Sequence, residues 1–346
     1  DTKVSLLSQF MNLKLLLLPF SLVYQGVTGL RNLAFDKGLL KSHKFQTPII
    51  SVGNLSVGGT GKTPMIEYLV SLLQDDYQVA IVSRGYGRKT RGYIEVTQDH
   101  NTNDVGDEPL QYKNKFPHVR VAVCADRVAA IQALEGRCDV ILLDDAYQHR
   151  YVAPAINILL TTQVNPYHQD YVLPSGWLRE SASGARRADI VILSKCNKST
   201  SYAVLQQLQF DLKLSQAQSM YFTAMDYGKQ LIGRSETISL DYLIDTRFTL
   251  VTGIAHSEPL VAFLTALGGR FDHLKFPDHH DFTNAECHHI NSCDLVVTTE
   301  KDFQRLAGRI DKKALYYLPV ATAFLYDRQA AFAEEITNRI TYHRKH

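Results

Sequence analysis

The chain has 346 residues, enough for two domains of ordinary size, and its 45% hydrophobic and 21% charged residues are typical of a globular protein. Its formal net charge of +2 gives no overall attraction to nucleic acid, so we expect no nucleic-acid partner. The five cysteines are an odd number without the spacing of a disulfide framework, which favours a reducing compartment. We expect a monomer.

An apolar stretch near the N-terminus, residues 15–24, is flanked by cations such as Lys14 and Arg31. The stretch is too short to span a bilayer, which takes roughly 20 apolar residues, and Pro19 interrupts it. We predict that residues 1–25 form a helix in a membrane interface, with its basic residues on anionic headgroups. The alternative is a helix packed on the surface of a domain.

The next segment combines a strand, a glycine-rich loop and a helix. Residues 48–52 predict a buried strand, and apolar residues recur with helical spacing over 63–74. In a phosphate-binding loop of this kind, glycines let backbone N–H groups approach phosphate oxygens, and a lysine reaches the outer phosphates. Serine stands at position 56 where the usual pattern has glycine, so a chance glycine-rich turn is the alternative. We predict that a nucleoside triphosphate binds at Ser56, Val57, Gly58, Gly59, Thr60, Gly61, Lys62 and Thr63.

An arginine-rich turn follows the strand predicted at 78–83. Its glycines permit close backbone approach, and Arg84 and Arg88 offer bidentate forks for phosphate, with Tyr86 between them. We predict an anion site that contacts substrate, although an arginine-rich solvated turn has the same composition.

Ionisable groups also stand at the starts of two predicted helices. Asp107 and Glu108 open a helix predicted at 107–114, where the first is a candidate base for a substrate hydroxyl and the second a candidate substrate contact. The helix dipole favours acids at this position in any case. Arg127 follows the strand predicted at 119–123 and stands near the start of a helix at 126–135, either as a substrate contact or as a surface cation.

The apolar strand predicted at 139–143 ends in two adjacent carboxylates. An acid at a strand end beside a phosphate-binding loop usually holds Mg²⁺, directly or through water. Gln148 and His149 follow at the same rim and offer donors to a substrate, unless the segment is only a polar loop. We predict that the Mg²⁺ ligands are Thr63, Asp144 and Asp145.

The alternation of strands and helices continues with strands at 156–161 and 189–194 and a helix at 203–209. It predicts an α/β fold of the P-loop NTPase type, with a mainly parallel sheet whose ligands bind beyond the carboxyl ends of the strands. A connecting strand at 220–224 leads to a second series of strands and helices, which ends in an amphipathic helix at 327–340 that packs on either domain. The predicted parts are a membrane-interface segment at 1–25, a P-loop domain at 26–215, a linker at 216–225 and a smaller α/β domain at 226–346.

The smaller domain contains a dense group of ionisable residues at 276–282. Asp278 and His279 stand in it, and a carboxylate near an imidazole is the usual way to tune that ring for proton transfer near neutral pH. Spacing alone leaves it open whether this cluster is functional.

Several of these segments together resemble the tetraacyldisaccharide 4′-kinase family, the lipid A 4′-kinases. The resemblance runs from about residue 15 to about residue 306, and it is carried by VGNLSVGGTGKTP at 52–64, SRGYG at 83–87, GDEP at 106–109, DDAYQHR at 144–150, LPSGWLRE at 173–180, FPDHH at 276–280 and TTEKD at 298–302. The loop with Ser56 resembles this family's own variant. Ala146 departs from the glycine often expected there, without an evident cost to function.

The resemblance implies transfer of the γ-phosphoryl group of ATP to the 4′-hydroxyl of a tetraacylated glucosamine disaccharide 1-phosphate, the lipid A precursor, to give a lipid IVA-type product. It implies peripheral attachment to the cytoplasmic face of the bacterial inner membrane, and a base formed by Asp107 and His279 together. Arg179 and Glu180 are added as substrate contacts.

In this interpretation the P-loop, Lys62 and Mg²⁺ hold ATP, and a domain closure brings Asp107 of the first domain to His279 of the second. Two alternatives stay open. One is a P-loop kinase for a soluble metabolite, which has no use for the apolar N-terminus. The other is a membrane-associated P-loop nucleotide switch. Its guanine-binding sequence would be Asn-Lys-x-Asp, which SKCN at 194–197 matches only weakly, because it has no acid at the fourth position.

Overall fold

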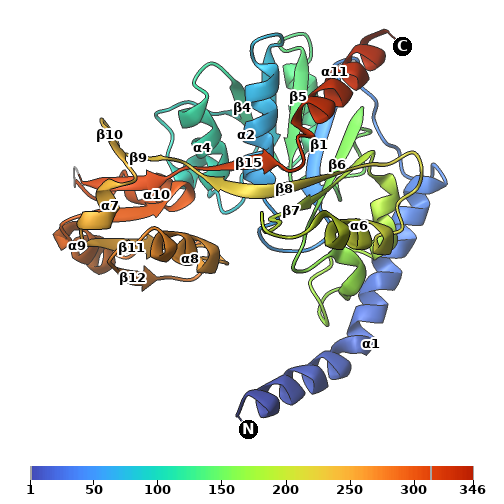
Figure 1. Ribbon diagram of the computed structural model, residues 1–346. Helices are drawn as coiled ribbons and strands as arrows, with labels where there is room; N and C mark the ends of the chain where they lie inside the picture. The colour runs from blue at the N-terminus through green and yellow to red at the C-terminus, as the bar shows by residue number, and fades with distance from the viewer. Residues whose placement is uncertain (1, 312–313, 346) are drawn as a thin grey trace. The chain divides into compact units, whose positions relative to one another are not determined.

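The computed structural model describes the backbone of residues 2–311 and 314–345, with side chains from residue 16 onward within these ranges. Its contacts divide the chain into two compact units (Figure 1). Unit 1 comprises Asp1–Val82, Arg127–Met225 and Ala323–His346, and unit 2 comprises Ser83–Asp126 and Asp226–Thr322.

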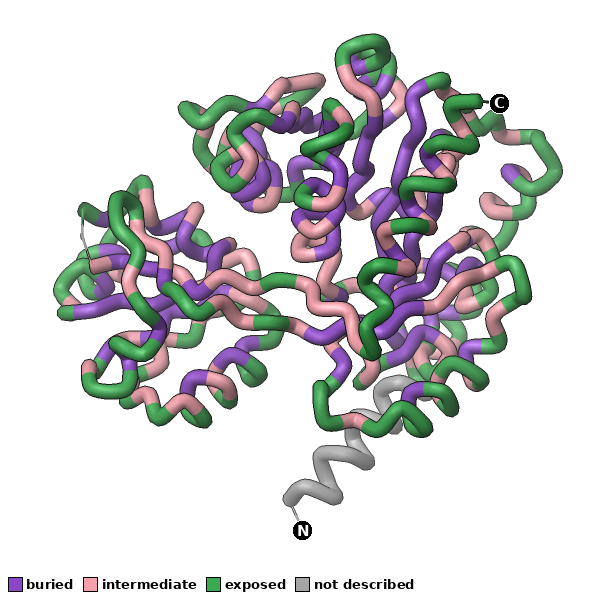
Figure 2. The backbone as a smooth tube through the Cα atoms, turned by 45° about the horizontal axis from the view of Figure 1, so that its top comes forward, coloured by how far each residue is buried: buried purple, intermediate pink, exposed green. Residues whose placement is uncertain are grey.

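Unit 1 is built on a parallel sheet with the strand order β8-β7-β6-β1-β5-β2. All residues of β1, β2, β5 and β7 are buried, as expected of central strands in a parallel sheet. Figure 2 shows these buried residues in purple along the strands. The predicted strands and the mainly parallel α/β architecture are confirmed, with bounds β1 Ile49–Asn54, β2 Val79–Ser83, β5 Val140–Asp144, β6 Ile156–Thr162, β7 Ile190–Ser194 and β8 Ser219–Tyr227.

The helices of unit 1 pack through apolar residues at helical spacing. In α2 these residues include Met65, Leu69 and Leu73, and α11 buries Ile336 and Ile340. The last helix, which the sequence could not assign to a domain, therefore groups with unit 1. The helical segments are α1 Thr2–Asp36, α2 Lys62–Leu73, α5 Arg127–Leu134, α6 Tyr202–Asp211, α11 Gln329–Lys345 and the short 3₁₀ turns Tyr167–Gln169 and Ala182–Arg187, and β15 Val320–Phe324 leads into α11.

Helix α1 is longer than the predicted segment and contains Pro19. Its side chains before residue 16, including the predicted Lys14 and Leu15, lie outside the described residues. Ser21 is buried, and its hydroxyl accepts a 2.9 Å hydrogen bond from the backbone N–H of Ser175. Several apolar side chains of the same helix are exposed, namely Leu16, Phe20, Leu22, Val23, Val27 and Leu30.

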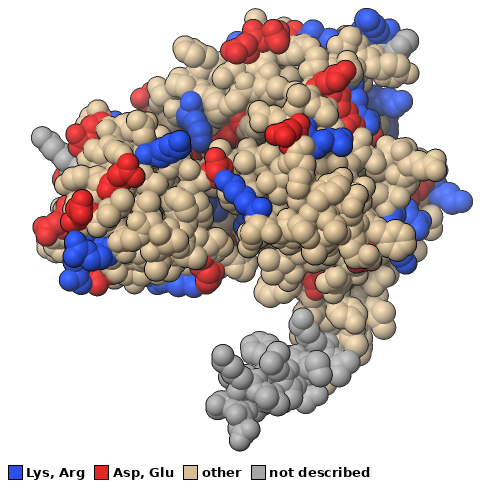
Figure 3. All heavy atoms as spheres, in the orientation of Figure 1, with Lys and Arg blue, Asp and Glu red and all other residues tan. Residues whose placement is uncertain are grey.

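The described part of α1 up to residue 30 carries no charged side chain, and Figure 3 draws it without blue or red. Within the described part of the chain, no helix has the length and apolar character needed to cross a membrane.

Unit 2 contains a six-stranded sheet in the order β10-β9-β14-β13-β11-β12. Its strands β14, β13, β11 and β12 are parallel neighbours, whereas β9 runs antiparallel to both β14 and β10. A short antiparallel pair, β3 with β4, belongs to the same unit. The bounds are β3 Ile94–Glu95, β4 Arg120–Val123, β9 Gln230–Ile232, β10 Thr237–Ser239, β11 Phe248–Thr252, β12 Phe271–Lys275, β13 Val296–Thr299 and β14 Leu315–Leu318.

Residues 83–126 join unit 2 because α4 packs against α10. This grouping differs from the domain bounds predicted from the sequence, which kept this segment with the P-loop. Helix α10 begins after Thr299, whose hydroxyl accepts a hydrogen bond from the N–H of Asp302 and caps the helix. The helices of unit 2 are α3 Thr102–Val105, α4 Asp107–Lys115, α7 Tyr242–Asp245, α8 Glu258–Ala266, α9 Asn284–Ser292 and α10 Glu300–Leu306.

Candidate active site

The predicted phosphate-binding loop lies between β1 and α2 of unit 1. Gly61 has φ +88° and precedes the first residue of α2, a left-handed conformation that L side chains rarely adopt. The N–H groups of the first turn lack intrahelical acceptors and meet no capping side chain from Gly61, so they can bind an anion. Ser56 pairs with Leu178 in an isolated antiparallel bridge, which ties the start of the loop to the segment before Arg179.

Asp145 holds two cations beside this loop. Lys62 Nζ lies 3.6 Å from Asp145 Oδ1 and 3.3 Å from Asn54 Oδ1. Arg179 donates to both carboxylate oxygens of Asp145, at 3.0 and 3.1 Å, in a bidentate pair. Burial raises the pKa of Asp145, but the charges of Lys62 and Arg179 outweigh it and hold that pKa below its usual value.

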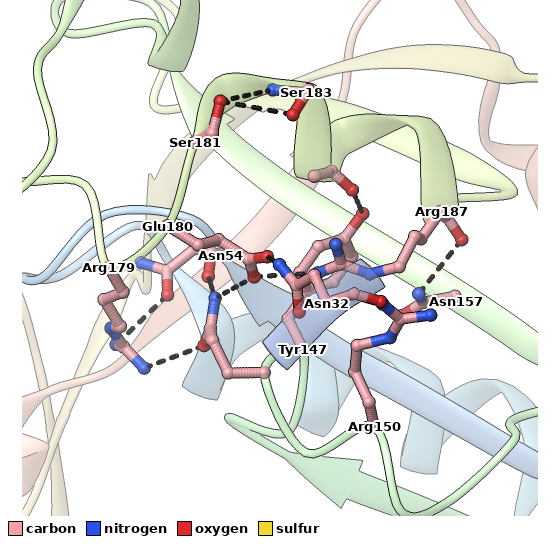
Figure 4. A network of polar contacts seen from close by, with 12 residues as sticks. Asn32, Asn54, Tyr147, Arg150, Asn157, Arg179, Glu180, Ser181, Ser183 and Arg187 are labelled. Carbon is pink, nitrogen blue, oxygen red and sulfur yellow. Dashed lines mark hydrogen bonds and ion pairs between the residues drawn. The ribbon is translucent and has the colours of Figure 1, made fainter. Parts of the chain in front are cut away.

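A polar network extends from Arg179 into the rest of unit 1 (Figure 4). Arg179 also donates to Asn54 Oδ1 at 3.2 Å and to Gln148 Oε1 at 3.3 Å. Gln148 in turn donates to the backbone carbonyl of Asn54 at 2.9 Å and to Glu180 Oε1 at 3.1 Å. The structure therefore brings together three predicted residues, Gln148, Arg179 and Glu180, with Lys62 and Asp145 at the edge of the network.

Glu180 is buried and accepts from Arg187 at 2.7 Å and from Asn32 of α1 at 2.6 Å. Both of its oxygens are thus engaged by side chains of the protein. Sequence reasoning missed Asn54, Arg187 and Asn32. Asn54 is the last residue of a buried strand, so the strand-end argument used for Asp144 could have found it.

The residues predicted to hold Mg²⁺ lie at the same sheet edge. Asp144 is the buried last residue of β5, and its Cα is in register with Val52 of β1, two residues before that strand ends. Thr63 is the second residue of α2. Among the described residues none partners the buried hydroxyl of Thr60, so the loop has a polar group to offer a ligand. A hydroxyl and carboxylates fit Mg²⁺, which usually keeps several waters and takes phosphate oxygens as further ligands.

Lys195, directly after β7, is a loop neighbour that sequence reasoning did not select. Its Nζ lies 3.8 Å from where a Cβ would stand on Gly59. Burial lowers the pKa of Lys195, and the charge of Lys62 lowers it further. The sequence signal was its place at the end of a predicted strand.

In unit 2, Asp107 and His279 lie in hydrogen-bond contact. Gly106 has φ +93°, and a Cβ there would stand 2.9 Å from the carbonyl oxygen of Tyr86, so only glycine admits this approach. Asp107 then begins α4, and its Oδ2 lies 3.2 Å from His279 Nδ1. The two residues meet within one unit.

Arg305 of α10 donates to Asp107 and lies close to the ring as well. Its Nη2 contacts Asp107 Oδ2 and is 3.1 Å from His279 Nδ1. Burial raises the pKa of Asp107, but hydrogen bonds from His279 and Arg305 and the charges of Arg305 and Lys301 lower it more, to about 2. Asp107 is therefore ionised at neutral pH and is by itself a weak proton acceptor.

Helix α10 contributes two more groups to this cluster. Lys301 Nζ is 2.9 Å from His279 Nε2 and 2.8 Å from Glu108 Oε1. Asp302, which is fully buried, accepts from Arg305 at 3.1 Å and from the N–H of Gly253 at 2.8 Å. Sequence reasoning did not select Lys301, Asp302 and Arg305, although the first two lie in the segment TTEKD at 298–302, which helps to carry the family resemblance.

The other predicted substrate residues differ in their surroundings. Tyr86 has its ring centroid 5.0 Å from that of His279. The guanidinium of Arg88 donates hydrogen bonds to the backbone carbonyls of Gly92, at 2.6 Å, and Val123, at 3.4 Å. Arg84 and Asp278 are exposed, His149 is half-buried with its ring centroid 5.8 Å from that of Tyr151, and Arg127 is buried at the start of α5.

Comparison with known proteins places these features in one family. Residues 13–341 match the model of the family described as tetraacyldisaccharide-1-P 4′-kinase. The chain is 44% identical over 323 residues to the tetraacyldisaccharide 4′-kinase of Flavobacterium johnsoniae, covering 92% of this chain and 94% of that one. It is 41% identical over 345 residues to the protein of the same name from Phocaeicola vulgatus, covering 94% of each.

A solved structure is also similar over nearly the whole chain. The crystal structure of the "apo" form of LpxK from Aquifex aeolicus in complex with ATP matches with a TM-score of 0.77 and 31% identity, covering 95% of this chain and 99% of that one. The predicted P-loop NTPase-like fold is thereby confirmed.

Proposed function

Because the chain belongs to the tetraacyldisaccharide-1-P 4′-kinase family, we propose that it is a kinase of lipid A biosynthesis that phosphorylates the 4′-hydroxyl of a tetraacylated glucosamine disaccharide 1-phosphate at the expense of ATP. The observation that carries this conclusion is the family match over residues 13–341, which includes both the P-loop and the Asp107–His279 pair. The reaction is phosphoryl transfer to an alcohol, so the site must position two substrates and neutralise charge.

The P-loop of unit 1 is proposed to bind ATP. Backbone N–H groups of residues 56–63 would surround the phosphates, with Lys62 on the outer ones. Thr63 with Asp144 or Asp145 would hold Mg²⁺, which would neutralise the charge that develops on the phosphate oxygens. Asp145 already holds Lys62 at 3.6 Å, so this lysine is kept beside the loop.

The Asp107–His279 pair of unit 2 is proposed to accept the proton of the sugar hydroxyl. A hydroxyl is a poor nucleophile unless a base orients it or removes its proton. Since Asp107 has a pKa of about 2, the imidazole is the better proton acceptor of the two. Asp107 would orient the ring through Nδ1 and stabilise the imidazolium that forms.

The substrate joins a phosphorylated sugar head to four acyl chains, so a protein that acts on it needs cations for the head and access to a bilayer surface. Arg179 beside the P-loop is the best-placed candidate for the head, because its guanidinium lies in the network with Asn54 and Gln148. The exposed apolar side chains of α1 support peripheral binding to the cytoplasmic face of the inner membrane. We propose that the protein acts there as a monomer.

Product analysis tests this proposal. The full chain is incubated with ATP, Mg²⁺ and tetraacyldisaccharide 1-phosphate in mixed micelles, and the lipid fraction is examined by mass spectrometry. We expect a product heavier by one phosphoryl group, dependent on ATP and absent with the Lys62→Ala variant. ATP turnover that is stimulated only by soluble alcohols would favour a metabolite kinase over the lipid kinase. ATP turnover that no acceptor stimulates would favour a nucleotide switch.

A further inference from the structure

The imidazole of His279 is contacted at both nitrogens. Its Nδ1 faces Asp107 Oδ2 at 3.2 Å and Arg305 Nη2 at 3.1 Å, and its Nε2 faces Lys301 Nζ at 2.9 Å. His279 has φ +57°, a left-handed conformation that histidine adopts more readily than most residues, and its N–H donates to the carbonyl of Gly253 at 3.2 Å. The ring is thus held by its backbone and by two helices.

These contacts select one form of the ring. An ammonium group has three donors and no acceptor, so the nitrogen facing Lys301 must present its lone pair. Nδ1 also faces a donor, Arg305 Nη2, but it alone has an acceptor beside it, Asp107 Oδ2, so the proton of the neutral ring lies on Nδ1. A doubly protonated ring would direct an N–H at the ammonium of Lys301, which is a repulsive contact. Lys301 itself is held by Glu108 at 2.8 Å.

We propose that Lys301 is a positioning residue that keeps Nε2 of His279 unprotonated, in the form that can accept a proton from the incoming sugar hydroxyl. The inference deepens the proposed function and rests on it. The hydroxyl displaces Lys301 from Nε2, while Glu108 retains the ammonium nearby. As the hydroxyl oxygen forms its bond to the γ-phosphorus, the bond from that phosphorus to the bridging oxygen of ADP breaks, and the hydroxyl proton passes to Nε2.

The other charged groups around the ring fix the sign of the effect. Asp107 favours the protonated ring, and Arg305 opposes it while being balanced by Asp302. Glu108 partly balances Lys301 at 2.8 Å, and Tyr86 contributes an aromatic ring 5.0 Å from the imidazole. On the loop of His279 itself, Asp278 is exposed, His280 is engaged by Glu286 at 2.9 Å, and Asp281 by Arg309 at 3.1 Å. Removal of the Lys301 charge should therefore make protonation of the ring easier.

Nuclear magnetic resonance of the full chain labelled with ¹⁵N-histidine tests this contact without any acceptor. The His279 signals are assigned with the His279→Asn variant, and long-range ¹H–¹⁵N spectra report which ring nitrogen carries the proton. We expect the proton on Nδ1 at neutral pH. In Lys301→Met, the midpoint of the ring titration should rise by roughly 1–3 pH units, the usual effect of one charge within a few ångströms. Lys301→Arg should keep the wild-type midpoint.

A matched control separates the charge effect from the loss of a helix contact. Lys115 of α4 pairs with Glu300 of α10 at 3.2 Å and so bridges the same two helices. Lys115→Met should leave the ring midpoint unchanged. Glu108→Gln, which removes a negative charge from the neighbourhood with little change of shape, should lower the midpoint and gives a second readout should Lys301→Met fold poorly.

Kinetics then connect the ring to turnover. In Lys301→Met the acidic limb of the kcat/KM profile, which reports the free enzyme, should move to higher pH together with the ring midpoint, whereas a purely structural role would lower kcat/KM equally at every pH. A proton found on Nε2 of His279 would overturn the inference even if the lipid is phosphorylated. The same holds if the midpoint of the ring titration is unchanged in Lys301→Met. Failure to phosphorylate the lipid, in contrast, would contradict the proposed function alone. The ring titration is measured with no acceptor present, so its result does not depend on that reaction.

Discussion

The two units hold their charged groups in different ways. In unit 1, Lys62, Asp145 and Arg179 stand at the edge of the P-loop, where the side chains of Lys62 and Asp145 are 15% and 35% exposed. In unit 2, the side chains of Arg305 and Asp302 are 8% and 0% exposed, and their partners surround them. The first group is open to a ligand, and the second is a cluster of ion pairs around one imidazole.

This difference matches two kinds of work. A phosphate-binding site needs donors that can leave a carboxylate for a phosphate, so its ion pairs should be partly solvated and replaceable. An imidazole that accepts a proton needs a fixed orientation and a fixed tautomer, and buried ion pairs around the ring can provide both. Each of these charges then depends on its partners, because a buried charge that loses its partner is strongly destabilising. Substitutions in unit 2 should therefore be strongly coupled to one another, and substitutions in unit 1 should act mainly on the nucleotide.

The largest effect is expected from the Asp107–His279 pair. Asp107→Asn and His279→Asn should each lower kcat by about 10²–10⁴-fold, the usual contribution of a general base, with little change in ATP affinity. Asparagine suits position 279 because it tolerates the φ of +57° found there. The double variant should be little worse than the worse single variant, since the two groups act as a unit.

Steady-state kinetics with saturating ATP, and nucleotide binding by calorimetry, supply the two measurements. Effects that multiply in the double variant would mean that Asp107 and His279 contribute independently, and the contrast between the units would then lose its basis.

The Lys62→Ala variant tests the open character of unit 1. Loss of one charged contact to the transferring phosphoryl group should lower kcat by about 10²–10³-fold and weaken ATP binding as well. Because Arg179 still donates to both carboxylate oxygens of Asp145, at 3.0 and 3.1 Å, the variant should stay folded, with at most a modest fall in the thermal unfolding midpoint. Lys198→Ala, which removes an exposed lysine of the same unit, is the control and should keep full activity. Turnover near wild type in Lys62→Ala would remove the P-loop from the mechanism.

The same contrast explains what could be predicted from the sequence. The P-loop is one continuous stretch between a strand and a helix, so its spacing alone predicted the strand and the helix that the structure has, and it marked residues 56–63 as a candidate nucleotide site. Asp144 and Asp145 followed from the rule that ligands bind beyond strand ends. The parallel sheet of unit 1 followed from buried strands that alternate with helices.

The cluster of unit 2 could not be assembled in this way. Asp107, His279 and Arg305 come from three distant segments, and their meeting depends on the packing of α4 on α10, which no local pattern encodes. Local patterns indicated Asp107 and His279 separately as candidates, and only the resemblance implied that they act together. Lys301, Asp302 and Arg305 were not selected, because a lysine, an aspartate and an arginine on a short helix read as an ordinary solvated face.

Acid stability measures how far the unit 2 cluster depends on its charges. The folded pKa of Asp107, about 2, lies below its ordinary value of 3.8, so the ionised carboxylate stabilises the fold above about pH 4 and this contribution is lost as the pH falls toward 2. The shift corresponds to about 2 kcal/mol of unfolding free energy. We expect wild type to lose roughly that much more than Asp107→Asn between pH 4 and pH 2.

Urea unfolding at several pH values checks this. Other carboxyl groups titrate in the same range, but they are common to both proteins and cancel in the difference. Equal losses in wild type and Asp107→Asn would show that the cluster does not hold Asp107 in its ionised form.

The smallest effect on turnover is expected at α1, where unit 1 differs from unit 2 in its exposed apolar surface. Polar replacement of Leu16, Phe20, Leu22 and Val23, which are 65–71% exposed, should release the protein from anionic vesicles and raise KM for vesicle-presented lipid. Burial of such side chains stabilises membrane association by about 25 cal/mol per Å². Turnover on a detergent-dispersed, short-chain acceptor should change little, because no bilayer is involved.

Substitution is a cleaner experiment here than deletion of residues 1–25. Deletion would also remove Ser21, which binds the backbone of Ser175, and Tyr24, whose hydroxyl donates to the carbonyl of Arg179 at 3.2 Å beside the P-loop. Phe210→Ser in α6 provides the control, since Phe210 is 76% exposed in the same unit but lies outside α1. If the substituted protein still sediments with vesicles as well as wild type does, α1 is a packed surface helix, and attachment must be sought among other residues of the chain.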